Sequence, residues 1–484
     1  MSRFRDLRVG AIVGVFWTGG GQVLRNIISL GTSVLLARLL VPEDFGVFAL
    51  SVVLVEFAQM FALAGFGASI VQQQQTNARA LSTLFWINLG LALLFALLLC
   101  AAAMPVAAWF RQPQLVPVLA LASLSVLLAG AMVVPTAMLN MELRFRDLTM
   151  AQTLGSLLGS AGAIGIAAAG GGVWALAAQP VIGSTITLFD ARRRLGWVPQ
   201  LVFDWPSVRG MMRFSGQLLA STFFNFLNRN AWAAMIGRTL GAQQVGLFNL
   251  GQQIVFAPIA QFSGVVVRVL FPTLSKLNNE PEQFQRVWLR AFSTVGFLTF
   301  PILAGMMATL DDLVPVVFGN QWLGVIPVLQ FLCPVAMLQS VCTLSGSVLM
   351  SRGSGMPMLV LSIVALSVML LSLFVGQRWG LPGVTVGFAV GGVLTQLLQL
   401  SVALRLAHIS LATLGREIGP ALVCAVVTAV TMGTTAAVLP GLHAALRLLA
   451  CSLLGAAVYL ALSWKFNRRT IDFLMRSFRP SQAH

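Results

Sequence analysis

Two apolar stretches of the sequence each carry an arginine. Arg25 lies in GQVLRNIISLG (21–31), and Arg229 lies in FNFLNRNAWAAMIGR (224–238). A guanidinium inside hydrocarbon costs roughly 2.5–3.5 kcal/mol on insertion scales, so such side chains normally face a water-filled cavity or a partner. Because a guanidinium attracts anions, the two arginines predict an anion-binding cavity enclosed by apolar helices.

Polar side chains accompany both arginines. In the first stretch they recur every three or four residues and form one stripe on a helix: Thr18, Gln22, Arg25, Ser29 and Ser33 or Thr32. The second stretch and the one after it repeat the pattern with Gln217, Ser221, Asn225, Asn228, Asn249, Gln252 and Gln253. Amides both donate and accept hydrogen bonds, which suits the binding of hydroxyl groups. The residues predicted to bind substrate beside the two arginines are Gln22, Asn225, Asn228 and Gln252.

One acidic residue, Glu56, is expected at a depth similar to that of Arg25, with Gln59 one helical turn away. The first alternative is structural: Glu56 and Arg25 form an internal ion pair, and the amides are hydrogen-bonding contacts between helices. In the second alternative Glu56 is a titrating group through which an ion is coupled to the function of the cavity. For Arg229 no acid is expected at comparable depth in its own half of the chain.

The composition identifies an integral membrane protein. Of 484 residues, 58% are hydrophobic and only 9% are charged, against about 25% charged in soluble domains. The apolar segments have the length of helices, and the alternating ten-residue segments of a transmembrane barrel do not occur, so the predicted fold is all-α. Fourteen spans are expected, at about 11–37, 45–71, 80–103, 114–139, 148–169, 173–190, 214–237, 242–267, 287–310, 326–350, 355–376, 380–404, 418–438 and 442–464.

The basic residues indicate an orientation in the membrane. The net charge is +16, which in a soluble protein would raise nucleic-acid binding as a possibility. Here 23 of the 30 lysines and arginines fall on the side of both termini and 5 on the other, a bias that follows the positive-inside rule. We therefore expect cytoplasmic termini and contacts with lipid head groups, and no nucleic-acid partner.

The remaining reactive side chains predict neither a metal site nor an enzyme. The five cysteines fall inside expected spans, and the three histidines lie in loops or the tail, so no cofactor is expected. The longest connections, 191–213 and 268–286, are too short for an extramembrane catalytic domain. Apart from Glu43 and Asp44, the outer face has one acidic pair, Asp311 and Asp312.

The chain contains an internal repeat. ARLLVPEDFGVFAL (37–50) aligns with GRTLGAQQVGLFNL (237–250) at a constant offset of 200 residues. Six spans per copy give both halves the same orientation, an architecture of transporters in which the substrate lies between the halves and the halves alternate access. The predicted domains are an N-lobe at 1–190, a linker at 191–213, a C-lobe at 214–404, and two further spans with a basic tail at 405–484.

Six segments, in order and spacing, resemble the Wzx-type polysaccharide flippases of the multidrug/oligosaccharidyl-lipid/polysaccharide (MOP) exporter superfamily. They are LLARLLVPEDFGVFAL (35–50), LSTLFWINLGL (81–91), MLNMELRFRDL (138–148), GGVWALAAQ (171–179), FNFLNRNAWAAMIGRTLGAQQVGLFNL (224–250) and RVLFPTLSKL (268–277). The resemblance implies two six-helix lobes and two peripheral helices. It also implies a cationic cavity, a role that falls here on Arg25, Arg229 and Arg268. Relatives often carry an acid where this chain has Trp232.

The same resemblance implies a substrate and a location. The substrate would be an undecaprenyl-diphosphate-linked oligosaccharide, moved from the inner to the outer leaflet of the bacterial inner membrane for O-antigen, capsule or exopolysaccharide synthesis. A polysaccharide polymerase and chain-length or export machinery would be its partners. Two alternatives stay open. A lipid II-type flippase has the same diphosphate-lipid chemistry, whereas a MATE-like exporter of cationic drugs would need more acid than the one Glu56 set against two intramembrane arginines.

Overall fold

The computed structural model describes residues 2–63, 70, 77–206, 223, 226–352, 355–468 and 470–472, without the side chains of 2–16, 265, 268 and 355–359. Within these residues 89% of the chain is helical and no strand occurs, which confirms the all-α class. The chain forms two compact units, Met1–Gly246 and Leu247–His484, each with its own packing.

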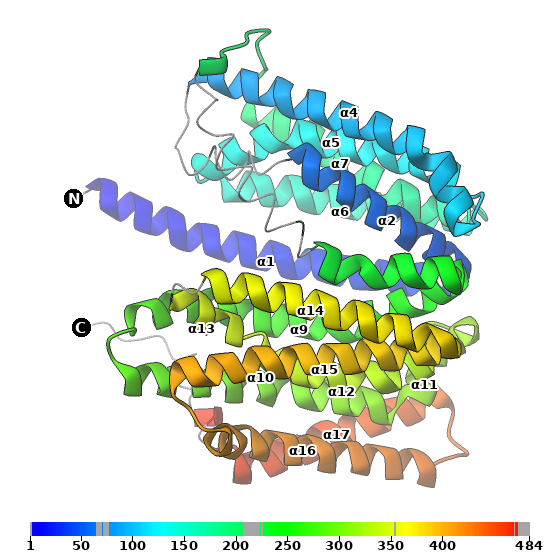
Figure 1. The fold of residues 1–484 in the computed structure, drawn as a ribbon, viewed down its shortest axis with the longest axis vertical. Helices are drawn as coiled ribbons and strands as arrows, with labels where there is room; N and C mark the ends of the chain where they lie inside the picture. Colours follow the sequence, from blue (N-terminus) through cyan, green and yellow to red (C-terminus); the bar gives the residue numbers. More distant parts are fainter. Residues whose placement is uncertain are drawn as a thin grey trace. The chain divides into compact units, whose positions relative to one another are not determined.

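The first unit consists, in its described part, of long helices that pack pairwise (Figure 1). They are α1 (Ser2–Leu39), α2 (Pro42–Leu63), α4 (Ala78–Phe110), α5 (Leu115–Met141), α6 (Phe145–Ala168), α7 (Val173–Leu195) and a helix at 226–239. Residues at the ends of several of these helices determine where the helices begin or end. The Asn77 side chain caps α4 by accepting a hydrogen bond from the Arg79 amide. Gly172 and Gly196 flank the two ends of α7. Their φ angles of 53° and 67° are positive, a backbone conformation that glycine adopts without strain.

Helices α6 and α7 approach each other closely through glycines. A Cβ on Gly159 would lie 2.8 Å from the Gln179 carbonyl oxygen and 3.1 Å from the Cα of Gly183. Gly155, one turn earlier on α6, faces Thr187 and Gly183 in the same way. Small residues four apart are what allow backbones of membrane helices to pack at short range. The glycines therefore fix the distance between the two helices.

The second unit contains most of α9 and all later helices. Its described elements are α9 (Ala242–Lys276), α10 (Pro281–Ala308), α11 (Leu310–Val317), η1 (Asn320–Val325), α12 (Ile326–Cys342), α13 (Ser345–Ser351), α14 (Gly355–Gly376), η2 (Gln377–Trp379), α15 (Gly380–Ala407), α16 (Leu411–Val438) and α17 (Ala444–Phe466). Fully buried aromatic side chains of α10, among them Trp288 and Phe292, lie in its core. The Tyr459 hydroxyl of α17 donates to the Phe297 carbonyl at 2.7 Å, and Arg447 forms an ion pair with Asp312. These contacts attach the last helix, α17, to α10 and α11.

One connection differs from expectation. The segment 268–286 was expected to be a long loop, but α9 continues to Lys276 and α10 begins at Pro281, so only residues 277–280 lie between the helices. The prediction is wrong because a helix can continue beyond its apolar segment as long as backbone hydrogen bonds do. Lys276 in the last turn of α9 also favours the helix, since it complements the helix dipole.

The helices identify a multi-pass membrane protein. In the described residues ten segments are long and apolar enough to cross a membrane. They are Pro42–Leu63, Ala78–Phe110, Leu115–Met141, Phe145–Ala168, Ala242–Lys276, Pro281–Ala308, Asn320–Ser351, Val360–Ala407, Leu411–Val438 and Ala444–Phe466. The count of fourteen spans and the lobe boundaries at 190 and 404 stay predictions.

The packing of α6 against α7 gives a stability prediction. We expect Gly159→Ala to lower the free energy of unfolding by about 1–3 kcal/mol. The new methyl group would meet backbone atoms of α7, which cannot move without shifting the helix. Gly165→Ala on the same helix is the matched control, since a Cβ there has no atom within 4 Å. Thermal unfolding of both variants in detergent measures the difference. Equal melting temperatures would contradict the proposed role of the close contact.

Candidate functional site

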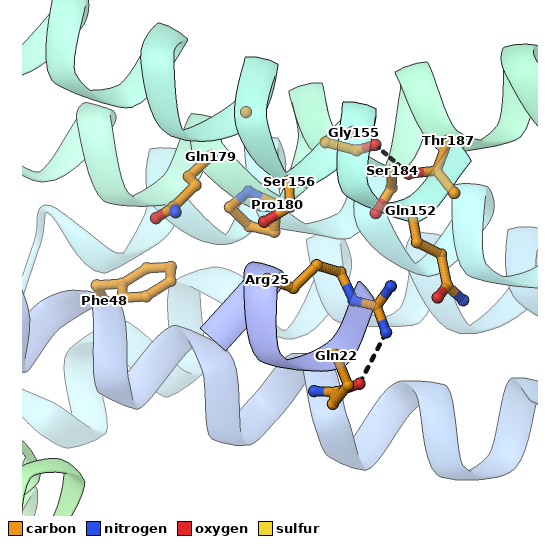
Figure 2. A pocket seen from close by; sticks show the side chains of 12 residues that line it. Gln22, Arg25, Phe48, Gln152, Gly155, Ser156, Gln179, Pro180, Ser184 and Thr187 are labelled. Atoms are coloured by element: carbon orange, nitrogen blue, oxygen red, sulfur yellow. Dashed lines mark hydrogen bonds between the residues drawn. The ribbon is translucent and has the colours of Figure 1, made fainter. Parts of the chain in front are cut away.

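The first unit contains a cavity of about 550 Å³ between α1, α2, α6 and α7 (Figure 2). Its volume is typical of small-ligand sites. The residues that line it are Gln22, Arg25, Phe48, Gln152, Gly155, Ser156, Gly159, Gln179, Pro180, Gly183, Ser184 and Thr187. These twelve residues include one arginine and no acid, and their other polar groups are amides and hydroxyls. The cavity therefore has the charge and hydrogen-bonding groups to hold an anion that carries hydroxyl groups.

Arg25 is the charged residue of this cavity. Its Nη2 donates to the Gln22 side-chain oxygen at 2.7 Å, and the Gln22 amide nitrogen donates to Asn26 at 3.0 Å, so the three side chains form one chain of hydrogen bonds on α1. The Nη1 of Arg25 is buried and has no hydrogen-bond partner among the described residues. A buried donor without an acceptor is costly, and a charged donor binds an anion more strongly than a neutral one does. Arg25 thus has a donor left for a ligand.

Helices α6 and α7 supply the polar groups opposite Arg25, and the sequence did not single them out. Gln152 and Ser156 lie one turn apart on α6, and Figure 2 shows them with Gln179 and Ser184 of α7 around the Arg25 side chain. The Gln179 amide donates to Ser160 at 3.3 Å, which orients it at the edge of the cavity. The spacing of Gln152, Ser156 and Ser160 by four residues is the signal that could have revealed this stripe.

Glu56 lies beside Arg229. Its carboxylate is 3.6 Å from the Arg229 guanidinium and accepts a 3.3 Å hydrogen bond from the Asn230 amide. In the described residues the ion pair of Glu56 is with Arg229, whereas the side chain of Arg25 binds Gln22, so the alternative of an Arg25–Glu56 pair does not hold. The Arg229 side chain is 74% exposed and that of Glu56 39%, so an anion can compete with Glu56 for Arg229.

The other predicted site residues are distributed over both units. Asn228 is half-buried on the helix at 226–239, and Asn225 lies outside the described residues. Gln252 on α9 is half-buried, and its amide nitrogen has no hydrogen-bond partner among the described residues. Arg268 is also on α9, but its side chain is outside the description. The structure thus brings Gln22 and Arg25 together in one cavity, and the gathering of all seven residues around one ligand stays a prediction.

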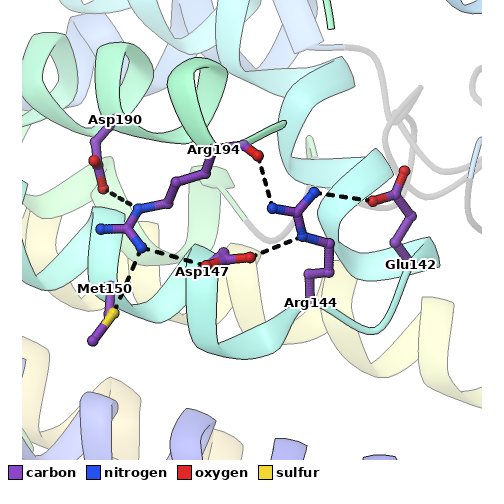
Figure 3. A network of polar contacts seen from close by, with 6 residues as sticks. All are labelled: Glu142, Arg144, Asp147, Met150, Asp190 and Arg194. Carbon is purple, nitrogen blue, oxygen red and sulfur yellow. Dashed lines mark hydrogen bonds and ion pairs between the residues drawn. The ribbon is translucent and has the colours of Figure 1, made fainter. Parts of the chain in front are cut away.

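A charged network joins the ends of α5, α6 and α7, of which α6 and α7 line the cavity (Figure 3). Arg144 donates to Asp147 at 2.8 Å, to Glu142 at 3.4 Å and to the Arg194 carbonyl at 2.7 Å. Arg194 in turn binds Asp190 at 2.7 Å and Asp147 at 3.3 Å. The hydrogen bond to Asp147 raises the pKa of Arg144 above its ordinary value. The network holds the end of α5, the start of α6 and the end of α7 in one arrangement, which supports the cavity between α6, α7 and α1.

Solved structures with the same helical fold include membrane transporters of two kinds. The lipid II flippase MurJ in an inward-closed conformation matches with a TM-score of 0.76 at 14% identity, over 94% of this chain and 99% of that one. An inward-facing multidrug resistance MATE family transporter of the MOP superfamily matches with a TM-score of 0.61 at 15% identity, over 79% and 95%. At these identities the likeness establishes the fold, which is that of multi-pass MOP-type transporters.

Sequence comparison identifies the family. Residues 35–327 match the family described as "Polysaccharide biosynthesis protein", and the chain belongs to that family. Relatives include the lipopolysaccharide biosynthesis protein WzxC of Escherichia coli K12, 28% identical over 83% of this chain and 82% of its own length. The teichuronic acid biosynthesis protein TuaB of Bacillus subtilis 168 is 28% identical over 70% and 71%. Family and fold place the chain among transporters and flippases, and not among enzymes.

The geometry of the cavity predicts which serines water-soluble reagents can reach. In a Cys100→Ala background, we expect Ser156→Cys to react with a small polar maleimide, because Ser156 lines the cavity. Ser160→Cys, one turn away, is the control and should react much more slowly, since Ser160 is only 4% exposed and binds Gln179. The rates are measured by mass spectrometry on the detergent-solubilised protein. Equally slow reaction at the two positions would show that the cavity is closed to water.

Proposed function

We propose that the protein moves oligosaccharides carried on undecaprenyl diphosphate from the cytoplasmic to the outer leaflet of the bacterial inner membrane, for the synthesis of surface polysaccharide. The observation that carries this proposal is the cavity around Arg25. It offers an unpartnered guanidinium donor among amides and hydroxyls, with no acid among its lining residues. These groups fit the two polar parts of such a substrate, a diphosphate and a chain of sugars.

The physical problem is to carry the polar part of the substrate across about 30 Å of hydrocarbon while its tail remains in lipid. In the proposed mechanism Arg25, Arg229 and Arg268 attract the diphosphate. The sugar hydroxyls bind Gln22 and the α6–α7 groups Gln152, Ser156, Gln179 and Ser184, with Asn225, Asn228 and Gln252 as further predicted contacts. The N-lobe and C-lobe then alternate between inward-open and outward-open states.

The membrane potential drives export of such a substrate. Moving a negative charge outward across a membrane that is negative inside is downhill by about 2.3 kcal/mol per charge per 100 mV. Coupling to protons or sodium is therefore not required by the charge balance. Glu56 remains the candidate for ion coupling, and its contact with Arg229 would link its charge state to anion binding.

The relatives support the class of substrate. WzxC and TuaB are named for lipopolysaccharide and teichuronic acid biosynthesis, and ExoT of Rhizobium meliloti, 28% identical over 62% of this chain, is named a succinoglycan biosynthesis transport protein. A polysaccharide polymerase and chain-length or export machinery are the proposed partners, and both termini are proposed to be cytoplasmic. Lipid II shares the diphosphate-lipid chemistry and is the second candidate substrate, favoured by the likeness of the fold to MurJ. A cavity for cationic drugs would need an acid, which its lining lacks.

The role of Arg25 is tested by transport in proteoliposomes. We expect Arg25→Ala to slow the movement of a fluorescent undecaprenyl-diphosphate oligosaccharide about 10- to 100-fold, because a hydrogen bond to a charged group contributes about 1.5–3 kcal/mol. Arg25→Lys should retain part of the rate, since lysine keeps the charge but loses the forked geometry. The exposed Arg378→Ala is the control with the same change of net charge. The rate is measured as the appearance of the sugar in the opposite leaflet.

The outcomes of this experiment separate function from folding. Slow transport by Arg25→Ala with an unchanged melting temperature assigns Arg25 to the substrate. Loss of both transport and thermal stability would assign Arg25 to structure and contradict the proposed role. Wild-type protein that moves a fluorescent lipid II but no oligosaccharide on undecaprenyl diphosphate would make lipid II the substrate. Wild-type protein that moves neither would overturn the proposed function.

The ion pair of Glu56 and Arg229 gives a second prediction. Glu56→Gln removes the carboxylate charge that partly neutralises Arg229, so we expect the diphosphate substrate to bind more tightly. An exposed ion pair contributes up to about 1 kcal/mol, which corresponds to at most about fivefold in Kd. Binding is measured by microscale thermophoresis with undecaprenyl diphosphate. In an Arg229→Ala background the same change should have no effect, and an equal gain there would exclude Arg229 from the anion site.

A further inference from the structure

The segment that follows α7 lies along the beginning of α4 (Figure 1). Four hydrogen bonds join residues 200–204 to the first turns of that helix. The backbone N–H of Gln200 donates to the Ser82 hydroxyl at 3.1 Å, and its backbone carbonyl accepts from the Trp86 indole at 2.9 Å. Thr83 donates to the Val202 carbonyl at 3.3 Å and accepts from the Asp204 amide at 2.8 Å. The segment 197–206, called here the α4 strap, is therefore fixed in place by its backbone.

The α4 strap exposes large apolar side chains although its backbone is held. Leu201 is 88% exposed, Val198 73% and Phe203 64%, and Trp205 stacks on Phe203 with ring centroids 6.2 Å apart. Because backbone hydrogen bonds hold the segment, these side chains are not needed to attach it to α4. Clustered exposed apolar groups of this size mark a surface that is covered in the working protein.

Two tryptophans of α4 indicate where this surface lies with respect to the membrane. Trp86 and Trp109 are 23 residues apart on one helix, about 35 Å at 1.5 Å per residue, slightly more than the hydrocarbon thickness of about 30 Å. Tryptophans that bracket a span are typical of the two membrane interfaces. Trp109 contacts Arg238, whose Nη1 donates to the Trp109 carbonyl at 2.6 Å. Since Gln200 bonds to Trp86, the α4 strap lies at the level of one interface.

Basic residues stand next to the strap. Arg79 in the first turn of α4 and Arg193 near the end of α7 are exposed, and Arg192 lies over the ring of Phe85 at 5.7 Å. Asp204 is the only acid among residues 191–206. Arg79 and the arginines after residue 191 are among the basic residues that the charge bias assigns to the cytoplasmic side, and the hydrogen bonds of residues 200–204 place residues 197–206 beside the start of α4. Anionic lipids are concentrated in the cytoplasmic leaflet and attract such residues.

We propose that the α4 strap is a lipid-binding surface that lies in the interface of the cytoplasmic leaflet. Leu201, Phe203 and Trp205 insert among the upper acyl chains, and Arg79 and Arg193 bind anionic head groups. An apolar face flanked by arginines is the combination found in segments that lie in a membrane surface. The strap thereby anchors the connection between α7 and the helix at 226–239 to the membrane at the level of Trp86.

The depth of the strap is measured by spin labelling of the full-length protein in nanodiscs. In a Cys100→Ala background, whose other four cysteines are buried, a nitroxide is attached to Leu201→Cys or, independently, to Phe203→Cys. Power saturation with oxygen and with a water-soluble nickel chelate reports immersion in lipid. Leu97→Cys, exposed on α4, is the lipid reference, and Asn279→Cys, in the short connection after α9, is the aqueous reference.

The accessibilities of the spin labels to oxygen and to the nickel chelate show whether the α4 strap lies in lipid, in water or against protein. We expect the oxygen-to-nickel ratio at positions 201 and 203 to exceed that of Asn279→Cys several-fold, and to rise further when phosphatidylglycerol replaces part of the phosphatidylcholine. Arg79→Gln with Arg193→Gln should abolish that second rise. A ratio equal to that of Asn279→Cys would place the strap in water and overturn the proposal. Low accessibility to both reagents would also overturn it, because the strap would then be covered by protein.

Discussion

The arrangement of the first unit depends on one constraint, that a guanidinium on an apolar helix must be surrounded by polar groups. Arg25 has Gln22 on its own helix and the amides and hydroxyls of α6 and α7 opposite. Gly155, Gly159 and Gly183 line the same cavity, and a Cβ on any of them would meet the facing helix. These glycines thus bring α6 and α7 together as one wall beside the one charged residue of the cavity.

Charges at the helix ends have a different function from charges inside the cavity. Arg144 and Arg194 bind acids and, for Arg144, a carbonyl oxygen, and Asp312 binds Arg447 in the second unit. These pairs stabilise contacts between helices, and each of the three arginines already binds a carboxylate. Arg25, in contrast, keeps a buried donor without a partner among the described residues. Because stability is supplied at the helix ends, the cavity can keep a donor without a partner among the described residues, and a bound anion is the partner that the proposed function gives it.

The sequence predicted those features that follow from local periodicity and not those that depend on tertiary contacts. The stripe of Gln22 and Arg25 was recognisable because both residues lie on one helix at a spacing of three. The opposite wall of the cavity was missed, because single serines and glutamines such as Ser156 and Gln179 occur equally at ordinary helix contacts. Depth in the membrane suggested that Glu56 pairs with Arg25. Depth does not specify which helix lies next to α2, and the partner is Arg229.

If the cavity binds the proposed substrate, its lining would let one site hold substrates that differ in their sugars. In the proposed function the diphosphate is the constant part of the substrate and is recognised by charge, for which Arg25 and, once Glu56 is displaced, Arg229 are the proposed groups. Sugars differ in the positions of their hydroxyls, and amides and hydroxyls such as Gln152, Gln179 and Ser184 can each donate or accept. Strict selection of one sugar would need several fixed donors and acceptors, as in sites that reject an analogue by leaving buried groups unpaired. From a cavity with one charged residue among amides and hydroxyls we instead expect binding of the constant part of the substrate and tolerance of variation in the rest.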